Sequence, residues 1–346
     1  MTERIDNANA FCREILPAVS RTFAVSIRLL PGPLRDAVGT AYLLCRIADT
    51  VEDAPELAAE LKASLLDDLA ECFNDPAAVV RFIERSTTVT GDDGHLRLIR
   101  NADLVFESYA KLPDATRRHI RHWVEEMIGG MRKFVLVYPH GIRIQSLDEY
   151  KEYCYYVAGT VGYLLTDLWH EHAPSIGRRR YEALRHRSRA FAEALQTVNI
   201  LKDVARDAEY ENSIYIPEQL LRDVGSGHAT ILSHDRAEQN HAALGQLIQL
   251  AWHDLDQATA YLLEIPRRAP EIRLFCALPL LFAYATLRDL TRTPGAIIRR
   301  EVVKISRAEV KAITVFSRVL VFSNRLMTWL VARIRARPLR LPLVEL

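Results

Sequence analysis

Apolar residues recur along most of this chain three and four residues apart, which is the spacing of one face of an α-helix. Helix breakers and polar clusters interrupt the pattern, as at Asp75-Pro76 and Ala173-Pro174. The stretches between them predict helices over residues 33–53, 57–73, 97–110, 114–133, 148–170, 179–208, 236–263, 270–290 and 307–336. Alternating apolar and polar positions are rare, and residues 134–145 are the best strand candidate.

No long linker or low-complexity segment divides the chain, although its 346 residues would allow two domains. Several predicted helices carry a mostly apolar face, so we expect them to pack around a common interior. The sequence therefore predicts one all-α domain over residues 1–346. Such a bundle can build its site from side chains on facing helices.

The predicted helix at 33–53 carries two carboxylates, Asp49 and Asp53, four residues apart. Tyr42 and Arg46 precede them on the same face, because the four positions are spaced 0, 4, 7 and 11. The face continues an apolar run, which indicates a buried helix. Buried carboxylates are costly unless cations or hydrogen-bond donors lie opposite them.

The predicted helix at 179–208 repeats this arrangement with Asp203 and Asp207. Gln196 and Asn199 precede these aspartates on the same face. One such pair alone is most simply a solvated acidic face with helical salt bridges. Two pairs, each continuing an apolar face, also indicate a cavity that holds divalent cations.

A cavity that holds several divalent cations is suited to binding a diphosphate substrate. Mg²⁺ typically combines a few carboxylates with water and phosphate oxygens, and Asn199 could add an amide oxygen. Arg46 and Lys202 are suited to the phosphates themselves, the first as a fork of donors and the second as a point charge.

Five motifs in this order resemble the squalene/phytoene synthase family. They lie at residues 20–23, 42–53, 153–162, 196–207 with 214–217, and 275–279 with 303–305. The last two segments are similar to the squalene synthase branch in particular. The resemblance covers roughly residues 17 to 320, and five ordered motifs are far more specific than a lone acidic pair.

The resemblance implies an isoprenoid synthase-type bundle with a central cavity between two aspartate-rich helices. The implied Mg²⁺ ligands are Asp49, Glu52, Asp53, Asp203 and Asp207. The implied diphosphate-binding residues are Ser20, Arg21, Arg46 and Lys202. The implied catalytic side chains are Tyr42, Tyr156 and Phe275. The rings of Tyr156 and Phe275 could stabilise carbocations that form during the reaction. The implied cofactor-binding residues are Asn199, Lys304 and Arg307.

The implied reaction joins two farnesyl diphosphates head to head through a cyclopropyl (presqualene) diphosphate. NADPH then reduces the last cation to give squalene. A non-reducing dehydrosqualene or phytoene-type synthase, or a presqualene diphosphate synthase, is the alternative. Lys202 replaces the arginine common in the family, and Ser306 interrupts a stretch that is usually basic in the squalene branch. In the squalene branch this usually basic stretch is linked to the phosphates of the nicotinamide cofactor. The interruption at Ser306 therefore weighs against NADPH as the reductant.

Two other classes fit less well. A non-catalytic helical scaffold would gain nothing from four clustered aspartates. A terpene cyclase also uses aspartate-rich helices, but it lacks the segment at 153–162 and this order of motifs.

Composition adds expectations about partners and compartment. The net charge of +1 gives no sign of a nucleic-acid partner, and none is expected. Five scattered cysteines without a CxxC pair fit a reducing cytoplasm. We expect no signal peptide, no membrane-spanning helix and a monomer.

The C-terminal part, residues 299–346, holds eleven Lys or Arg and three Glu. Its last predicted helix is amphipathic, with Lys311, Arg318 and Arg325 seven residues apart on one edge. Such an end can lie on an anionic membrane surface, here the inner membrane. The alternative is a core helix with a solvated basic edge.

Overall fold

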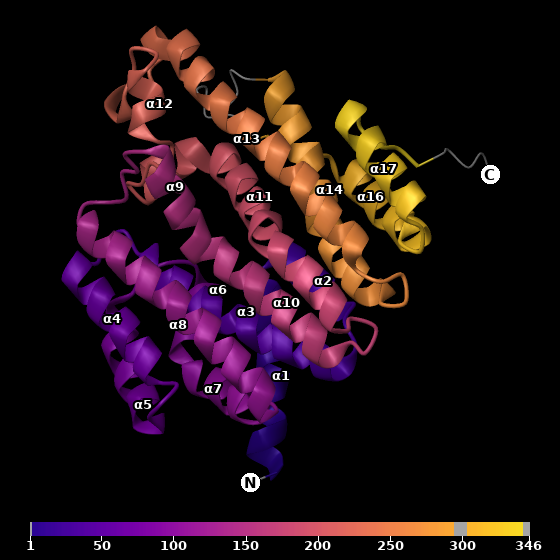
Figure 1. Ribbon diagram of the computed structural model, residues 1–346. Coiled ribbons are helices and arrows are strands. Elements are labelled where there is room, and N and C mark those ends of the chain that lie inside the picture. Colours follow the sequence, from indigo (N-terminus) through magenta and orange to yellow (C-terminus); the bar gives the residue numbers. More distant parts are fainter. Residues whose placement is uncertain (1, 294–302, 342–346) are drawn as a thin grey trace. The chain divides into compact units, whose positions relative to one another are not determined.

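The computed structural model describes residues 2–293 and 303–341, whose helices are drawn in Figure 1. The described part of the chain consists of helices joined by turns and loops, with a single isolated β-bridge and no strand. The all-α fold class is therefore confirmed. The chain divides into two compact units. The predictions of one domain and of a cavity between the two aspartate-rich helices involve both units and stay predictions.

Unit 1 comprises Met1–Ile142, Tyr155–Pro174 and Tyr210–Ser213. Its helices are α1 (Thr2–Val19), α2 (Arg21–Arg28), α3 (Gly32–Glu52), α4 (Ala59–Glu71), α5 (Pro76–Arg85), α6 (Asp93–Arg100), α7 (Ala102–Ala110), α8 (Asp114–Val137) and α10 (Thr160–His172), with a π-helical turn at Tyr155–Gly159. α3 packs against α1, α7, α8 and α10. Leu43, Leu44 and Ile47 on α3 are fully buried. This packing holds in place the helix that carries the first acidic motif.

Unit 2 comprises Arg143–Cys154, Ser175–Glu209 and Ile214–Leu346. Its helices are α9 (Leu147–Cys154), α11 (Arg178–Tyr210, whose last residue belongs to unit 1), α12 (Glu218–Arg222), α13 (Ala237–Glu264), α14 (Pro270–Arg292), α16 (Arg307–Leu320) and α17 (Asn324–Ala336). α14 packs against α13, α16 and α17. α14 is therefore the core helix of this unit.

α14 is also long and apolar enough to cross a membrane, which the sequence did not lead us to expect. However, 78% of its most apolar window is buried inside the protein. The helix also carries Arg273 and Arg288, both buried and both hydrogen-bonded within unit 2. These features are those of the core helix of a globular unit.

The strand predicted at 134–145 is wrong. Residues 134–137 are the last turn of α8, where Phe134 and Val135 are buried. The chain then runs as a loop, and the isolated β-bridge among the described residues joins Arg143 to Ile214. Aromatic and β-branched residues favour strands, but their packing on one face of α8 decides the structure here.

Several predicted helices have different boundaries. The helix predicted at 97–110 is interrupted at Asn101, and the one at 307–336 is interrupted at residues 321–323. The helix predicted at 148–170 contains the π-helical turn. α1, α2, α5 and α12 lie outside every predicted range. The long helices, such as α3, α8, α13 and α14, lie close to where the apolar pattern puts them.

Candidate active site

The second half of α3 brings the first set of predicted site residues together. The Arg46 guanidinium donates to the Tyr42 hydroxyl at 3.1 Å and lies 5.6 Å from the centre of its ring. Arg46 also forms an ion pair with Asp49 at 3.2 Å. Tyr42 in turn donates to the carbonyl of Val19 at 3.4 Å and packs against the ring of Phe23. The guanidinium is thus oriented from both sides.

Four carboxylates gather around the end of α3. Burial raises the pKa of Asp53 well above its usual range, and the charges of Glu211 and Asp49 raise it further. Burial likewise raises the pKa of Glu52, with Asp53 and Asp49 adding to the shift. Burial also raises the pKa of Asp49, against the influence of Arg46. The cluster thus gathers carboxylates in an environment that disfavours their charged forms.

Glu52 is the carboxylate of this cluster that is buried without a hydrogen bond to one of its oxygens. Its side chain is only 6% exposed, and its Oε1 has no hydrogen-bond partner. Lys62 approaches the cluster but donates to the backbone carbonyl of Glu52, at 2.6 Å. Burial lowers the pKa of Lys62, while Asp53 and Glu52 raise it. A buried carboxylate oxygen without a donor is the kind of group that a divalent cation satisfies.

The carboxylates alone do not form a complete metal centre. Among residues 2–293 and 303–341, no three His, Cys, Asp or Glu side chains lie close enough to hold an ion by themselves. Mg²⁺ commonly keeps water and substrate phosphate oxygens as ligands and takes only one or two carboxylates. The acidic end of α3 fits that partial role.

Two residues of this cluster were not predicted from the sequence. Glu211 follows the end of α11 and belongs to unit 1. His95 on α6 interacts electrostatically with Arg46 and Asp49, and burial lowers its pKa. Glu211 follows the second acidic motif closely in the sequence, which is a weak signal. Nothing in the local pattern around His95 indicates its position.

Ser20 and Arg21 lie at the start of α2. The Ser20 hydroxyl accepts a hydrogen bond from the backbone N–H of Phe23 at 3.1 Å, so Ser20 is the N-cap of this helix. Arg21 is the first helical residue. Ser20 thus has a structural role in addition to the predicted one at a diphosphate.

Tyr156 lies in the π-helical turn Tyr155–Gly159, a rare element that often occurs at functional sites. Its ring packs directly on Gly130 of α8, where a Cβ atom would lie 2.0 Å from Tyr156 Cγ. The neighbouring Tyr155 donates from its hydroxyl to Glu126 at 3.2 Å. The missing side chain at Gly130 is therefore what admits the Tyr156 ring.

In unit 2, α11 brings together three predicted residues. Lys202 forms an ion pair with Asp203 at 3.1 Å and lies 3.5 Å from the amide oxygen of Asn199. Asp207 lies one turn further along the same helix. Phe275 on α14 is 2% exposed and belongs to the core of unit 2.

The residues predicted to bind NADPH are near the start of α16. Lys304 and Arg307 are exposed, and neither forms an ion pair with any described residue. Ser306, between them, is the N-cap of α16 and accepts from the backbone N–H of Glu309 at 3.1 Å. Two exposed cations without an ion-pair partner among the described residues fit a phosphate-bearing cofactor, whereas Ser306 is explained by its role as a helix cap.

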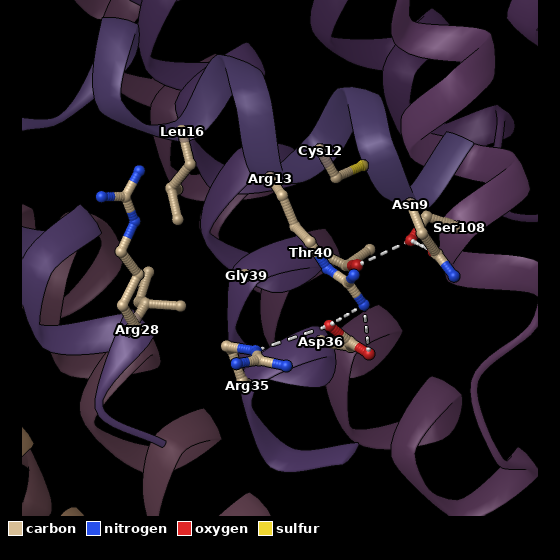
Figure 2. Close-up of a pocket in the computed structure, with 11 residues that line it drawn as sticks. Asn9, Cys12, Arg13, Leu16, Arg28, Arg35, Asp36, Gly39, Thr40 and Ser108 are labelled. Carbon is tan, nitrogen blue, oxygen red and sulfur yellow. Dashed lines mark hydrogen bonds and ion pairs between the residues drawn. The ribbon is translucent and has the colours of Figure 1, made fainter. Parts of the chain in front are cut away.

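The structure also contains a cavity of about 280 Å³ in unit 1, away from the acidic cluster (Figure 2). It is lined by α1, α2, the first part of α3 and Ser108 of α7. Arg13 and Arg35 flank Asp36 there, at 3.2 and 4.0 Å. None of the predicted site residues lines it.

Comparisons with known proteins agree on one family of relatives. The sequence model for squalene/phytoene synthase matches residues 16–309. Squalene synthase BSS of Botryococcus braunii is 32% identical over 292 residues, which are 82% of this chain and 58% of that protein. Squalene synthase of Schizosaccharomyces pombe is 29% identical over 289 residues, covering 82% of this chain and 60% of that protein. The chain thus spans less than two thirds of the length of these relatives.

Solved structures show the same likeness. The ligand-bound structure of TcSQS has a TM-score of 0.81 at 25% identity, and the match covers 98% of this chain and 94% of that chain. The squalene synthase HpnC from Alicyclobacillus acidocaldarius has a TM-score of 0.56 at 19% identity, over 84% of this chain and 95% of that one. A dehydrosqualene synthase has a TM-score of 0.54 at 18% identity, over 96% and 97%. The last two support the fold alone.

Proposed function

The chain belongs to the squalene/phytoene synthase family, and from that premise we propose that it is a prenyltransferase acting on two molecules of farnesyl diphosphate. The proposed reaction joins them head to head through a cyclopropyl diphosphate to squalene. The acidic end of α3 is the observation that supports this most directly. It combines clustered carboxylates of raised pKa with an oriented guanidinium.

We propose that Asp49, Glu52 and Asp53 hold Mg²⁺ together with the substrate diphosphate. Asp203 and Asp207 are proposed to do the same from α11. When bound, Mg²⁺ supplies Lewis-acid stabilisation of the departing diphosphate.

Arg46 is suited to bind a phosphate oxygen, because Tyr42 and Asp49 hold its guanidinium in one orientation. The packed Tyr156 ring helps to exclude water, which would trap a carbocation.

The last step of the reaction, which decides the final product, is a separate part of the proposal. Lys304 and Arg307 supply exposed positive charge for the phosphates of NADPH, which supports reduction to squalene. The alternative is a non-reducing product such as dehydrosqualene. It remains the rival because Ser306 places a helix cap within a stretch that is usually basic in the squalene branch.

The test is to incubate the purified protein with farnesyl diphosphate and Mg²⁺, with and without NADPH, and to identify the hydrocarbons. We expect squalene only in the presence of NADPH. Dehydrosqualene in both reactions would assign the protein to the non-reducing branch. No release of diphosphate under any condition would refute the proposed function.

A pair of variants tests the metal ligands separately. Asp53→Asn should abolish diphosphate release, while Asp67→Asn should leave it unchanged. Asp67 is a matched control because it lies on α4 of the same unit, is exposed and forms a surface ion pair with Arg132. Full release by Asp53→Asn would contradict the ligand assignment.

A further inference from the structure

The hairpin of α16 and α17 exposes large apolar side chains on both helices and in the turn between them. Five such residues lie within fifteen positions, and we call them the apolar ridge: Val315 (41% exposed), Val319 (67%), Phe322 (56%), Leu326 (45%) and Trp329 (51%). Val315 and Val319 share one face of α16, and Leu326 and Trp329 share one face of α17. Phe322 lies in the turn between the two helices. A clustered apolar surface of this kind marks an interaction site more often than scattered exposed residues do.

The ridge is not a core face that has lost its partner, because the opposite faces of the hairpin are already packed. Ile313, Met327 and Leu330 are fully buried. Both helices contact α14, and the yellow hairpin lies beside it in Figure 1. The apolar ridge is therefore additional to the side chains that build unit 2.

Two buried arginines of α14 fix the hairpin in this orientation. Arg273 donates to the carbonyl of Val321 at 2.8 Å and to the Asn324 side chain at 2.9 Å, so it holds the turn. Arg288 donates to both carboxylate oxygens of Glu309 at 2.8 and 3.0 Å. A hairpin anchored in this way presents the apolar ridge as a fixed surface.

The surface around the apolar ridge is basic. Lys311, Arg318 and Arg325 are exposed and form no ion pair with any described residue. Within residues 303–341 the only acidic residue is Glu309, which is 3% exposed and paired with Arg288. The exposed part of this hairpin thus combines apolar side chains with positive charge alone.

We propose that the apolar ridge and its three flanking cations dock this protein on an anionic membrane surface, with α16 and α17 lying in the interface. Charge favours an anionic membrane over a second copy of this chain as the partner of the apolar ridge. A second copy of the chain in a twofold arrangement would bring the same cations against each other. Anionic lipid headgroups complement them while the acyl boundary accepts the apolar side chains.

Vesicle flotation tests the proposal directly, using the full chain with phosphatidylglycerol-containing vesicles and with pure phosphatidylcholine vesicles. We expect binding to the anionic vesicles that weakens as salt is added. Phe322→Ser with Trp329→Ser should reduce binding about tenfold or more. Arg318→Gln with Arg325→Gln should reduce it for anionic vesicles in particular.

Val80→Ser is the matched control, because Val80 is 57% exposed but lies on α5 of unit 1. It should bind as the unaltered protein does. Tryptophan emission gives a second measurement, since Trp123 and Trp169 are buried whereas Trp329 is exposed. Contact with vesicles should shift the emission to shorter wavelength, and the shift should be lost in Trp329→Phe.

Equal binding by all variants, or no binding to anionic vesicles, would overturn the proposal. Concentration-dependent dimerisation that is lost in the Phe322→Ser, Trp329→Ser variant, without vesicle binding, would assign the apolar ridge to a second copy instead. The substituted side chains are exposed, so thermal unfolding should be unchanged and loss of folding is readily recognised.

Discussion

Replacing Gly130 by alanine should displace the Tyr156 ring from its place in the π-helical turn. The added Cβ would lie 2.0 Å from Tyr156 Cγ, 2.3 Å from Cδ1 and 2.4 Å from Cβ. Carbon atoms in contact lie about 3.5 to 4.0 Å apart, so the overlap is well over 1 Å. Rotation of the Tyr156 side chain cannot remove the clash with its own Cβ. The backbone of the turn or of α8 has to move.

The adjacent Gly129 provides the control. It is also within α8, but it is exposed and an added Cβ meets no atom within 4 Å. Alanine in a helix interior is favoured over glycine by about 1 kcal/mol, and both variants gain this term. Overpacking typically costs about 1–3 kcal/mol. Gly130→Ala should therefore be about 1–3 kcal/mol less stable than Gly129→Ala.

Urea unfolding of the two variants measures this difference, and diphosphate release measures its effect on the site. Gly129→Ala should be slightly more stable than the unaltered protein and fully active. Gly130→Ala should lose both stability and activity. Equal stability of the two variants would refute the close packing of Tyr156 on Gly130. A destabilised Gly130→Ala with full activity would refute a catalytic role for that ring position.

Three further predictions concern ionisable side chains and their partners. Glu309→Leu should lower the free energy of unfolding by about 3 kcal/mol, because the buried Arg288 guanidinium loses its bidentate partner and keeps, among the described residues, only Asp289 and the carbonyl of Ile334. Arg288→Met with Glu309→Leu should lose less than the sum of the two single changes in a denaturant-unfolding cycle. His119 has a raised pKa through its hydrogen bond to Asp167, so its stabilising contribution is complete below pH 6.5 and lost as the pH rises through the folded-state pKa. His119→Asn should remove that dependence in thermal unfolding, and an unchanged pH profile would contradict the pairing. Glu52→Gln should raise the melting temperature at alkaline pH without metal, because the raised pKa makes the ionised form costly, while diphosphate release falls; a lowered melting temperature would contradict that electrostatic strain.

Helix periodicity predicted much of the fold because the long helices bury one continuous face. The prediction for 33–53 agrees with α3 at Gly32–Glu52, and that for 270–290 agrees with α14. The sequence missed short helices such as α2 and also missed the 18-residue α1. α1 contains Pro17 within the helix, and a proline normally indicates an end. Its place in unit 1 is set by packing against α3 and α7, which no local pattern shows.

The site was predictable only where its residues share one helix. Helical spacing put Tyr42, Arg46 and Asp49 on one face, and the structure joins them by a hydrogen bond and an ion pair. His95 and Glu211 reach the same cluster from other segments of unit 1. Their approach depends on how α6 and the end of α11 pack, so sequence spacing carries no information about it.

Two buried glutamates of this chain support the proposal that the end of α3 is a functional site. Glu309 is fully satisfied, since its oxygens accept from Arg288 and from the backbone N–H of Leu339. Glu52 is just as buried, yet its Oε1 accepts nothing and Lys62 donates to its backbone instead. A carboxylate kept for stability would have acquired partners as Glu309 has. Glu52 lacks them in a cluster whose other members also have raised pKa values, and that deficit suits a position where a cation and a diphosphate arrive together.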